Sequence, residues 1–159
     1  MSSDYFVKIK GAEGESDKTG HKDEIEIESW SWGVANASSA SIGGGSGQGK
    51  ASPTDISFSA PMSKATSNLI KMCAKGEHLE EVKLSARKSA GGQEDYLIIT
   101  LNDAFVTGIH TGGAGGGQTS STTSIAFKKF KIEFKIQDNK TGAVKPGTEF
   151  KWDVAKSDF

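Results

Sequence analysis

Apolar and polar residues alternate with a period of two over most of the chain, which is the pattern of half-buried β-strands. One segment, 95–106, is apolar on both faces and should therefore lie at the centre of a sheet. The alternation predicts strands at 5–10, 22–34, 54–60, 80–88, 95–106, 124–137 and 150–154. The protein should consist mainly of β-structure.

Two of the expected strands change the parity of their apolar positions partway along. In the segment 22–34 these positions are odd-numbered up to Ile27 and even-numbered from Trp30 onward. The segment 124–137 changes in the same way after Phe127. Each change requires a β-bulge or a sharp bend, and bent long strands allow a sheet to curl into a barrel.

A single segment has the period of an α-helix instead. Its apolar stripe, at about 100° per residue, consists of Met62, Ala65, Leu69, Met72 and Cys73. Ser63 is suited to cap the N-terminus, because its hydroxyl can accept a hydrogen bond from the first turn. Gly76 is suited to end the helix, because glycine adopts the left-handed conformation easily. We expect one helix at about 63–75.

Glycine is the outlier of the composition, with 20 of the 159 residues. Half of these glycines fall in two stretches, 42–50 and 111–124, and each stretch separates two expected strands. Both stretches are longer than the usual loop of about 4–6 residues. We therefore expect long glycine-rich loops that project from one β-domain spanning residues 1–159.

The first glycine stretch nearly matches a phosphate-binding loop, since residues 44–50 fit the pattern G-x-x-x-x-G-K. The next residue is Ala51 in place of Ser or Thr, so the hydroxyl that would bind Mg²⁺ is missing. Pro53 and a strand pattern follow, whereas a phosphate-binding loop opens into a helix. These departures disfavour nucleotide binding.

Residues that could carry catalysis are few. Cys73 could act as a nucleophile with His78 nearby in the sequence, but it lies on the apolar stripe, where a cysteine is usually inert. The three histidines, His21, His78 and His110, stand singly in polar segments and are expected at the surface. They and the single cysteine have no metal-ligand spacing. We expect no enzymatic activity, no cofactor and no metal.

The charge balance and the N-terminal sequence exclude further classes of protein. With 19 basic and 20 acidic residues, the net charge of −1 lacks the positive excess of a nucleic-acid-binding protein. The single cysteine cannot form an internal disulfide. The N-terminus has no signal-peptide pattern, and no apolar run approaches the roughly 20 residues that span a bilayer. We expect folding in the cytoplasm and no membrane insertion.

Charged residues alternate along two of the expected strands. One strand has Glu24, Glu26 and Glu28 on one face, and another has Lys129, Lys131 and Lys135 with Glu133 among them. Like charges two residues apart on a strand repel unless something opposes them. The charges either pair within a solvated sheet face or oppose complementary charges across a subunit interface.

Trp30 and Trp32 share one face of the expected strand 22–34. Such a pair could stack on sugars or bases. We favour the alternative, in which both indoles anchor the core of a curved sheet.

Taken in order along the chain, the motifs resemble the haemolysin-coregulated protein (Hcp) family, the tube subunit of the bacterial type VI secretion system. The segments that carry this resemblance are FVKIKGAEGES (6–16), HKDEIEIESWSWGV (21–34), GGGSGQGK (43–50), DISF (55–58), KATSNLIKMCAKGEHLEEVKLSARK (64–88), DYLIITL (95–101), TGGAGG (111–116) and EFKWDV (149–154).

The resemblance implies a tight β-barrel of two antiparallel sheets with one flanking helix. It implies homohexameric rings that stack into a hollow tube, are propelled out of the cell by a contractile sheath, and carry small effector proteins. Spike and baseplate components would be further partners, and export would need no cleaved signal peptide. The family's ring-docking loop maps to about residues 36–50, and its core consists of Ser41, Gly43, Gly44, Gly45, Ser46, Gly47, Gln48 and Gly49. Ser31 would face the lumen and contact effectors.

The sequence also departs from the pattern of many relatives. The loop after the T-G-G-x-G-G motif, where they carry charges, is neutral here, so an ion pair at that place is in doubt. The chain ends at Phe159, and we expect no fused effector domain after the barrel. A monomeric β-barrel that carries a small ligand is the alternative function.

Overall fold

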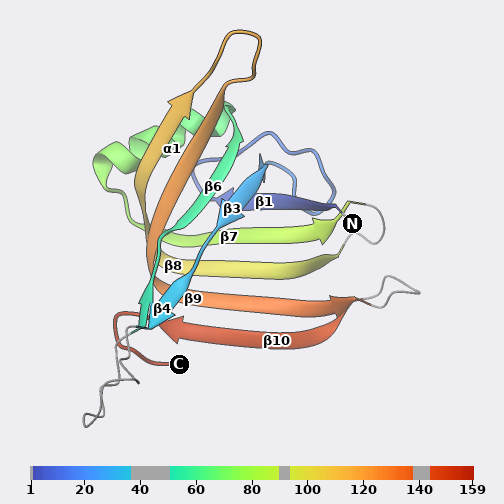
Figure 1. Ribbon diagram of the computed structural model, residues 1–159, viewed down its shortest axis with the longest axis vertical. Coiled ribbons are helices and arrows are strands. Elements are labelled where there is room, and N and C mark those ends of the chain that lie inside the picture. Colours follow the sequence, from blue (N-terminus) through green and yellow to red (C-terminus); the bar gives the residue numbers. More distant parts are fainter. Residues whose placement is uncertain (1, 37–50, 90–93, 138–143) are drawn as a thin grey trace.

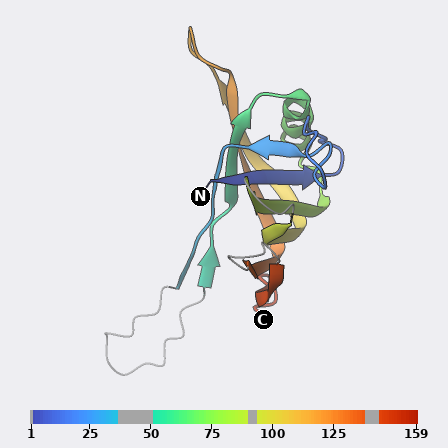
Figure 2. The same cartoon turned by 90° about the vertical axis from the view of Figure 1, so that its right-hand side faces the viewer.

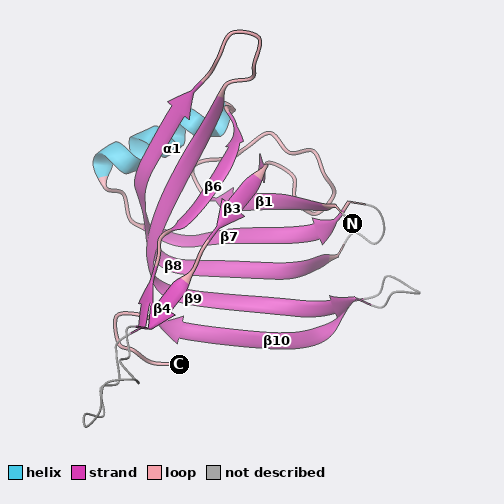
Figure 3. Cartoon of the chain, in the orientation of Figure 1, coloured by secondary structure: helices cyan, strands magenta, loops and turns pink. Residues whose placement is uncertain are grey.

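The computed structural model of the chain describes residues 2–36, 51–89, 94–137 and 144–159. Ten strands and one helix lie in these ranges (Figures 1 and 3). The strands are β1 (Ser3–Ile9), β2 (Ile25–Ile27), β3 (Ser29–Ser31), β4 (Val34–Asn36), β5 (Ala51–Pro53), β6 (Ile56–Pro61), β7 (Leu79–Lys88), β8 (Asp95–Gly112), β9 (Ser120–Gln137) and β10 (Val144–Asp153). The prediction of a mainly β fold with one helix is confirmed.

Eight of these strands form one antiparallel sheet that curls into a nearly closed barrel. Along the sheet the order is β2-β1-β7-β8-β9-β6-β3, and β10 pairs with β9. The two edges of this order, β2 and β3, are joined through the single residue Glu28, whose N–H donates to the carbonyl of Ser59 (2.7 Å). The chain itself thus closes the barrel, and the bend predicted just after Ile27 is confirmed. A small second sheet consists of β4 and β5.

β8 and β9 are long enough to belong to both halves of the barrel. The start of β9 pairs with β6, while its later part pairs with β10. Buried positions on β9 change from odd to even between Ile125 and Phe130, as the sequence predicted. β8 changes parity at the same level, where Asp103 has a positive φ of 51°. The two paired strands therefore bend together.

The helix α1 (Lys64–Lys75) packs on one side of the barrel. It begins as predicted, with the Ser63 hydroxyl accepting from the N–H of Ala65, and ends at Gly76, whose φ is 61°. Met62 lies outside the helix and is exposed, so its assignment to the apolar stripe was wrong. α1 has 12 residues, and nothing helical in the described ranges could cross a bilayer.

Two protrusions extend from opposite ends of the molecule (Figures 1 and 2). One is the β4–β5 ribbon, whose connecting residues 37–50 lie outside the described residues. The other is the end of the β8–β9 hairpin, which stays paired out to Gly112 and Ser120. Half of the stretch 111–124 is therefore paired strand, and residues 113–119 form the loop of this hairpin, so the long loop predicted there is shorter than expected.

Candidate functional site

Ser31, predicted to contact effectors, lies exposed on β3 within a sheet face made of hydroxyl groups. On β6, Ser59 is opposite Ser29 and Ser57 is opposite Ser31; on β9, Thr122 and Ser124 continue the two rows. We call this surface the hydroxyl face, which consists of Ser29, Ser31, Ser57, Ser59, Thr122 and Ser124. Two hydrogen bonds link its hydroxyls across strands, Ser57–Ser124 (3.2 Å) and Ser59–Thr122 (2.9 Å).

The hydroxyl face follows from strict alternation along its strands. Phe58 and Thr123, which alternate with the hydroxyl residues of β6 and β9, are buried, and Trp30 packs against the core. The core interpretation of the tryptophans is confirmed, since Trp32 also stacks on Phe130 with ring centroids 4.2 Å apart. Because successive strand residues point to opposite faces, the hydroxyls point away from the core.

One lysine of the row predicted on β9 pairs within the chain. Lys131 binds Glu133 (2.9 Å) and also Glu149 of β10 (3.1 Å). These carboxylates raise the pKa of Lys131, Glu133 most strongly, and the Lys131 ammonium lowers the pKa of Glu133. Lys129 is exposed, and Lys135 is half-buried. For Lys131 this arrangement matches the alternative in which charges pair within one sheet face, whereas Lys129 and Lys135 stay candidates for a subunit contact.

The acidic row predicted on the strand at 22–34 is only partly present. Glu24 precedes β2 and is buried, and its carboxylate lies 3.0 Å from Nδ1 of His21. Its assignment to an exposed interface is therefore wrong. Glu26 on β2 and Glu28 after it are exposed. They remain candidates for a contact with another molecule.

His21 is also buried, which corrects the prediction that it lies at the surface. Its ring stacks in parallel on Phe6, with centroids 4.2 Å apart, and its Nε2 lies 2.7 Å from Asp95. Arg87 covers the same Phe6 ring and donates to the carbonyl of Thr19 (2.7 Å). This cluster fixes the segment between β1 and β2 against the barrel.

The residues considered for catalysis do not form a catalytic group. His78 is half-exposed, and its hydrogen bond to Asp103 (2.9 Å) lowers the pKa of that carboxyl. Cys73 packs against the core. His110 is exposed, as predicted. Within the described ranges, no three His, Cys, Asp or Glu residues are grouped to hold a metal ion.

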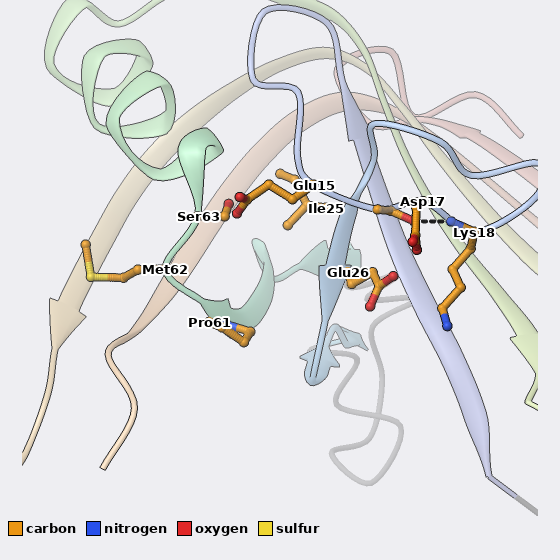
Figure 4. A pocket seen from close by; sticks show the side chains of 9 residues that line it. Glu15, Asp17, Lys18, Ile25, Glu26, Pro61, Met62 and Ser63 are labelled. Atoms are coloured by element: carbon orange, nitrogen blue, oxygen red, sulfur yellow. Dashed lines mark hydrogen bonds between the residues drawn. The ribbon is translucent and has the colours of Figure 1, made fainter. Parts of the chain in front are cut away.

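An acidic hollow of about 370 Å³ lies between the β1–β2 segment and the start of α1 (Figure 4). Glu15, Asp17 and Glu26 line it, together with Lys18. Ser63 also lines it, but the Ser63 hydroxyl is engaged in capping α1. The hollow therefore has carboxylates but no activated nucleophile.

The sequence did not reveal an exposed apolar surface at the other end of the barrel. Phe134 and Ile136 on β9 and Phe150 on β10 are 49%, 57% and 42% exposed. Phe150 is opposite Ile132 in the ladder, so its side chain shares a face with those of Phe134 and Ile136. We call these three residues the apolar ledge. Contiguous exposed apolar residues of this kind mark interaction surfaces.

The ring-docking loop predicted from Ser41 to Gly49 lies outside the described residues. Only its flanking strands β4 and β5 can be placed, and they point away from the barrel (Figure 2). Its role stays a prediction.

Comparisons with known proteins are consistent along the whole chain. The family model described as "Type VI secretion system effector, Hcp" matches residues 6–134. Protein hcp1 of Pseudomonas aeruginosa is 40% identical over 99% of this chain and 98% of its own length. The crystal structure of Hcp1 from Salmonella typhimurium has 31% identity, a TM-score of 0.81, and coverage of 99% of this chain and 98% of its own. A type VI secretion system effector from Yersinia pestis has 28% identity and a TM-score of 0.76, over 94% and 99% of the two chains.

Proposed function

The chain belongs to the Hcp family of type VI secretion proteins, and from this membership we propose that it assembles into six-membered rings that stack into a hollow, effector-carrying tube. The family resemblance in the sequence is confirmed, and the protein is a secreted structural component, a tube subunit, of that system and not an enzyme. Ring formation, ring stacking and the transport of effectors are proposed in addition to this family membership.

The apolar ledge is the observation that carries the assembly proposal. Three large apolar side chains at about half exposure are costly to leave in water, because burial of apolar surface is worth about 25 cal/mol per Å². A neighbouring subunit that covers the ledge would remove this cost. A ring requires such a contact to be head-to-tail and to close on itself.

The shape of the molecule supports a role as a wall element. β6, the β8–β9 hairpin and the β4–β5 ribbon follow one long side of the molecule, and α1 lies on the opposite side (Figure 2). We place the side with the hydroxyl face toward the lumen, which would make Ser31 a lumen residue. The two protrusions at opposite ends would then meet neighbouring rings, and the loop from Ser41 to Gly49 belongs to one of them.

The alternative, a monomeric carrier of a small ligand, requires a hollow barrel. The inner faces of the described strands instead meet in one packed core, in which Ile99 and Ile125 are completely buried. This packing favours the tube subunit.

We further propose where in the cell the rings assemble and how they leave it. Rings would assemble in the cytoplasm, contact the sheath, spike and baseplate components, and leave the cell by type VI secretion without a cleaved signal peptide. Small effector proteins would travel inside.

Light scattering or native mass spectrometry of the purified protein tests ring formation. We expect six times the chain mass of 16.7 kDa. Ile136→Asp should give smaller species, because it places a charge in the apolar ledge. Ile70→Asp is the matched control, since Ile70 is 44% exposed on α1, away from the ledge. A monomeric wild-type protein, or equal effects of the two substitutions, would contradict the proposal.

A further inference from the structure

The strand segments that form the hydroxyl face carry no formal charge, and the exposed Glu28 lies directly before the first of them. These segments are β3, β6, residues 104–112 of β8 and residues 120–127 of β9, and none of their residues is Asp, Glu, Lys or Arg. Over the whole chain, 25% of the residues are charged. The absence is therefore a local feature of this surface.

The remaining halves of β8 and β9 show the opposite composition. Residues 95–103 and 128–137 of these strands contain Asp95, Asp103, Lys128, Lys129, Lys131, Glu133 and Lys135. Charge thus changes within single continuous strands, at the bend beside Asp103. Strand formation does not require this partition, because the charged halves pair equally well across the ladder.

The hydroxyl face keeps free hydrogen-bonding capacity. Each hydroxyl offers one donor and two acceptors, whereas the bonds Ser57–Ser124 and Ser59–Thr122 each use one donor and one acceptor. At the margin, Asp55 accepts from the Thr107 hydroxyl (2.6 Å), so its carboxylate is engaged by a neighbour. His110 is exposed opposite Thr122 and is the titratable residue of these segments.

We propose that the hydroxyl face is a neutral contact surface for folded protein passengers, which it holds through hydrogen bonds and without ion pairs. This inference rests on the proposed function, because it takes the hydroxyl face to line the lumen. Charged groups at an interface fix orientation and exclude wrongly charged partners. A hydroxyl surface has neither effect, so it accepts passengers of either net charge and in several orientations.

The proposal predicts binding that hardly depends on ionic strength. Between about 0.1 M and about 1 M salt, the screening length falls from about 10 Å to about 3 Å. Ion-pair contacts would weaken strongly over this range, whereas hydrogen bonds between neutral groups would not. The dissociation constant for a passenger should change by less than about twofold, because no exposed ion pair contributes to it.

The test uses assembled rings and a passenger that mass spectrometry has identified among the proteins exported with the chain, purified and labelled for fluorescence anisotropy. The variant Ser57→Ala/Ser59→Ala/Thr122→Ala should raise the dissociation constant about tenfold or more. Each hydrogen bond lost to the passenger weakens binding modestly, and the three losses multiply in the dissociation constant. Ser59→Asp should make the binding depend on salt. Ser89→Ala is the control, because Ser89 follows the end of β7, outside the hydroxyl face, and its hydroxyl bonds to Ser2 and Asp4.

The possible failures are distinguishable. Wild-type binding that weakens steeply with salt, a triple variant that binds as tightly as wild type, or intact rings that bind none of the exported proteins would each overturn this inference. Failure of the proposed function would appear earlier, as a wild-type protein that forms no rings.

Discussion

The buried His21 cluster allows a direct comparison with an exposed pair of the same chemistry. His21 contacts two carboxylates, Glu24 and Asp95, and its side chain is only 6% exposed. His78 contacts one carboxylate, Asp103, and is 48% exposed. We therefore predict that His21→Ala is strongly destabilising, and that His78→Ala has a much smaller effect.

The magnitude follows from what each substitution leaves behind. Without His21, the Glu24 carboxylate stays buried without its partner, and Phe6 loses the ring stacked on it. A buried polar or charged group that is left without its hydrogen-bond partner costs about 1–3 kcal/mol or more. The carboxylate of Asp103 remains in contact with water, so the loss of His78 leaves no buried charge.

Urea unfolding followed by tryptophan fluorescence measures both effects. The substitutions should be made in an Ile136→Asp background, because assembly otherwise adds to the apparent stability. His21→Ala should lower the urea midpoint strongly without a large change in slope. Similar losses of stability for the two histidine variants would show that burial does not decide how much each histidine contributes to the stability of the fold.

Two further predictions concern single side chains. The Thr123 hydroxyl is completely buried and has no hydrogen-bond partner among the described residues, so Thr123→Val should stabilise the fold by about 1 kcal/mol in thermal or urea unfolding, and a loss of stability would contradict this. Lys131 lowers the pKa of Glu133 in the folded protein, so this pair stabilises the fold above the ordinary pKa of a glutamate and loses its effect as the pH falls through the folded pKa. Lys131→Met should therefore flatten the acid side of the stability–pH curve slightly, and an unchanged acid side would argue against the pair.

The sequence predicted those elements that are marked by residues close together in the chain, such as a change of alternation or a helix cap. The parity change between Ile27 and Trp30 located the turn that closes the barrel, and Ser63 and Gly76 marked the ends of α1. The hairpin beyond Val106 was missed because its buried positions include the hydroxyl residues Ser121 and Thr123, which hide the alternation.

Other features depend on distant parts of the chain. His21 appeared to be a surface residue because its local sequence is polar, while its partner Asp95 lies 74 residues further on. The apolar ledge looked like core, since alternation shows which face of a strand is apolar but not whether another layer covers it. The hydroxyl face became visible only when the register placed Ser31, Ser57 and Ser124 side by side.

We propose that the hydroxyl face of this tube subunit lines the lumen. Electron microscopy of rings built from Ser59→Cys in a Cys73→Ala background, labelled with a maleimide–gold cluster, tests it most directly. We expect six-fold rings with the label density inside the channel. Label density on the outer surface, or particles without a central channel, would contradict it.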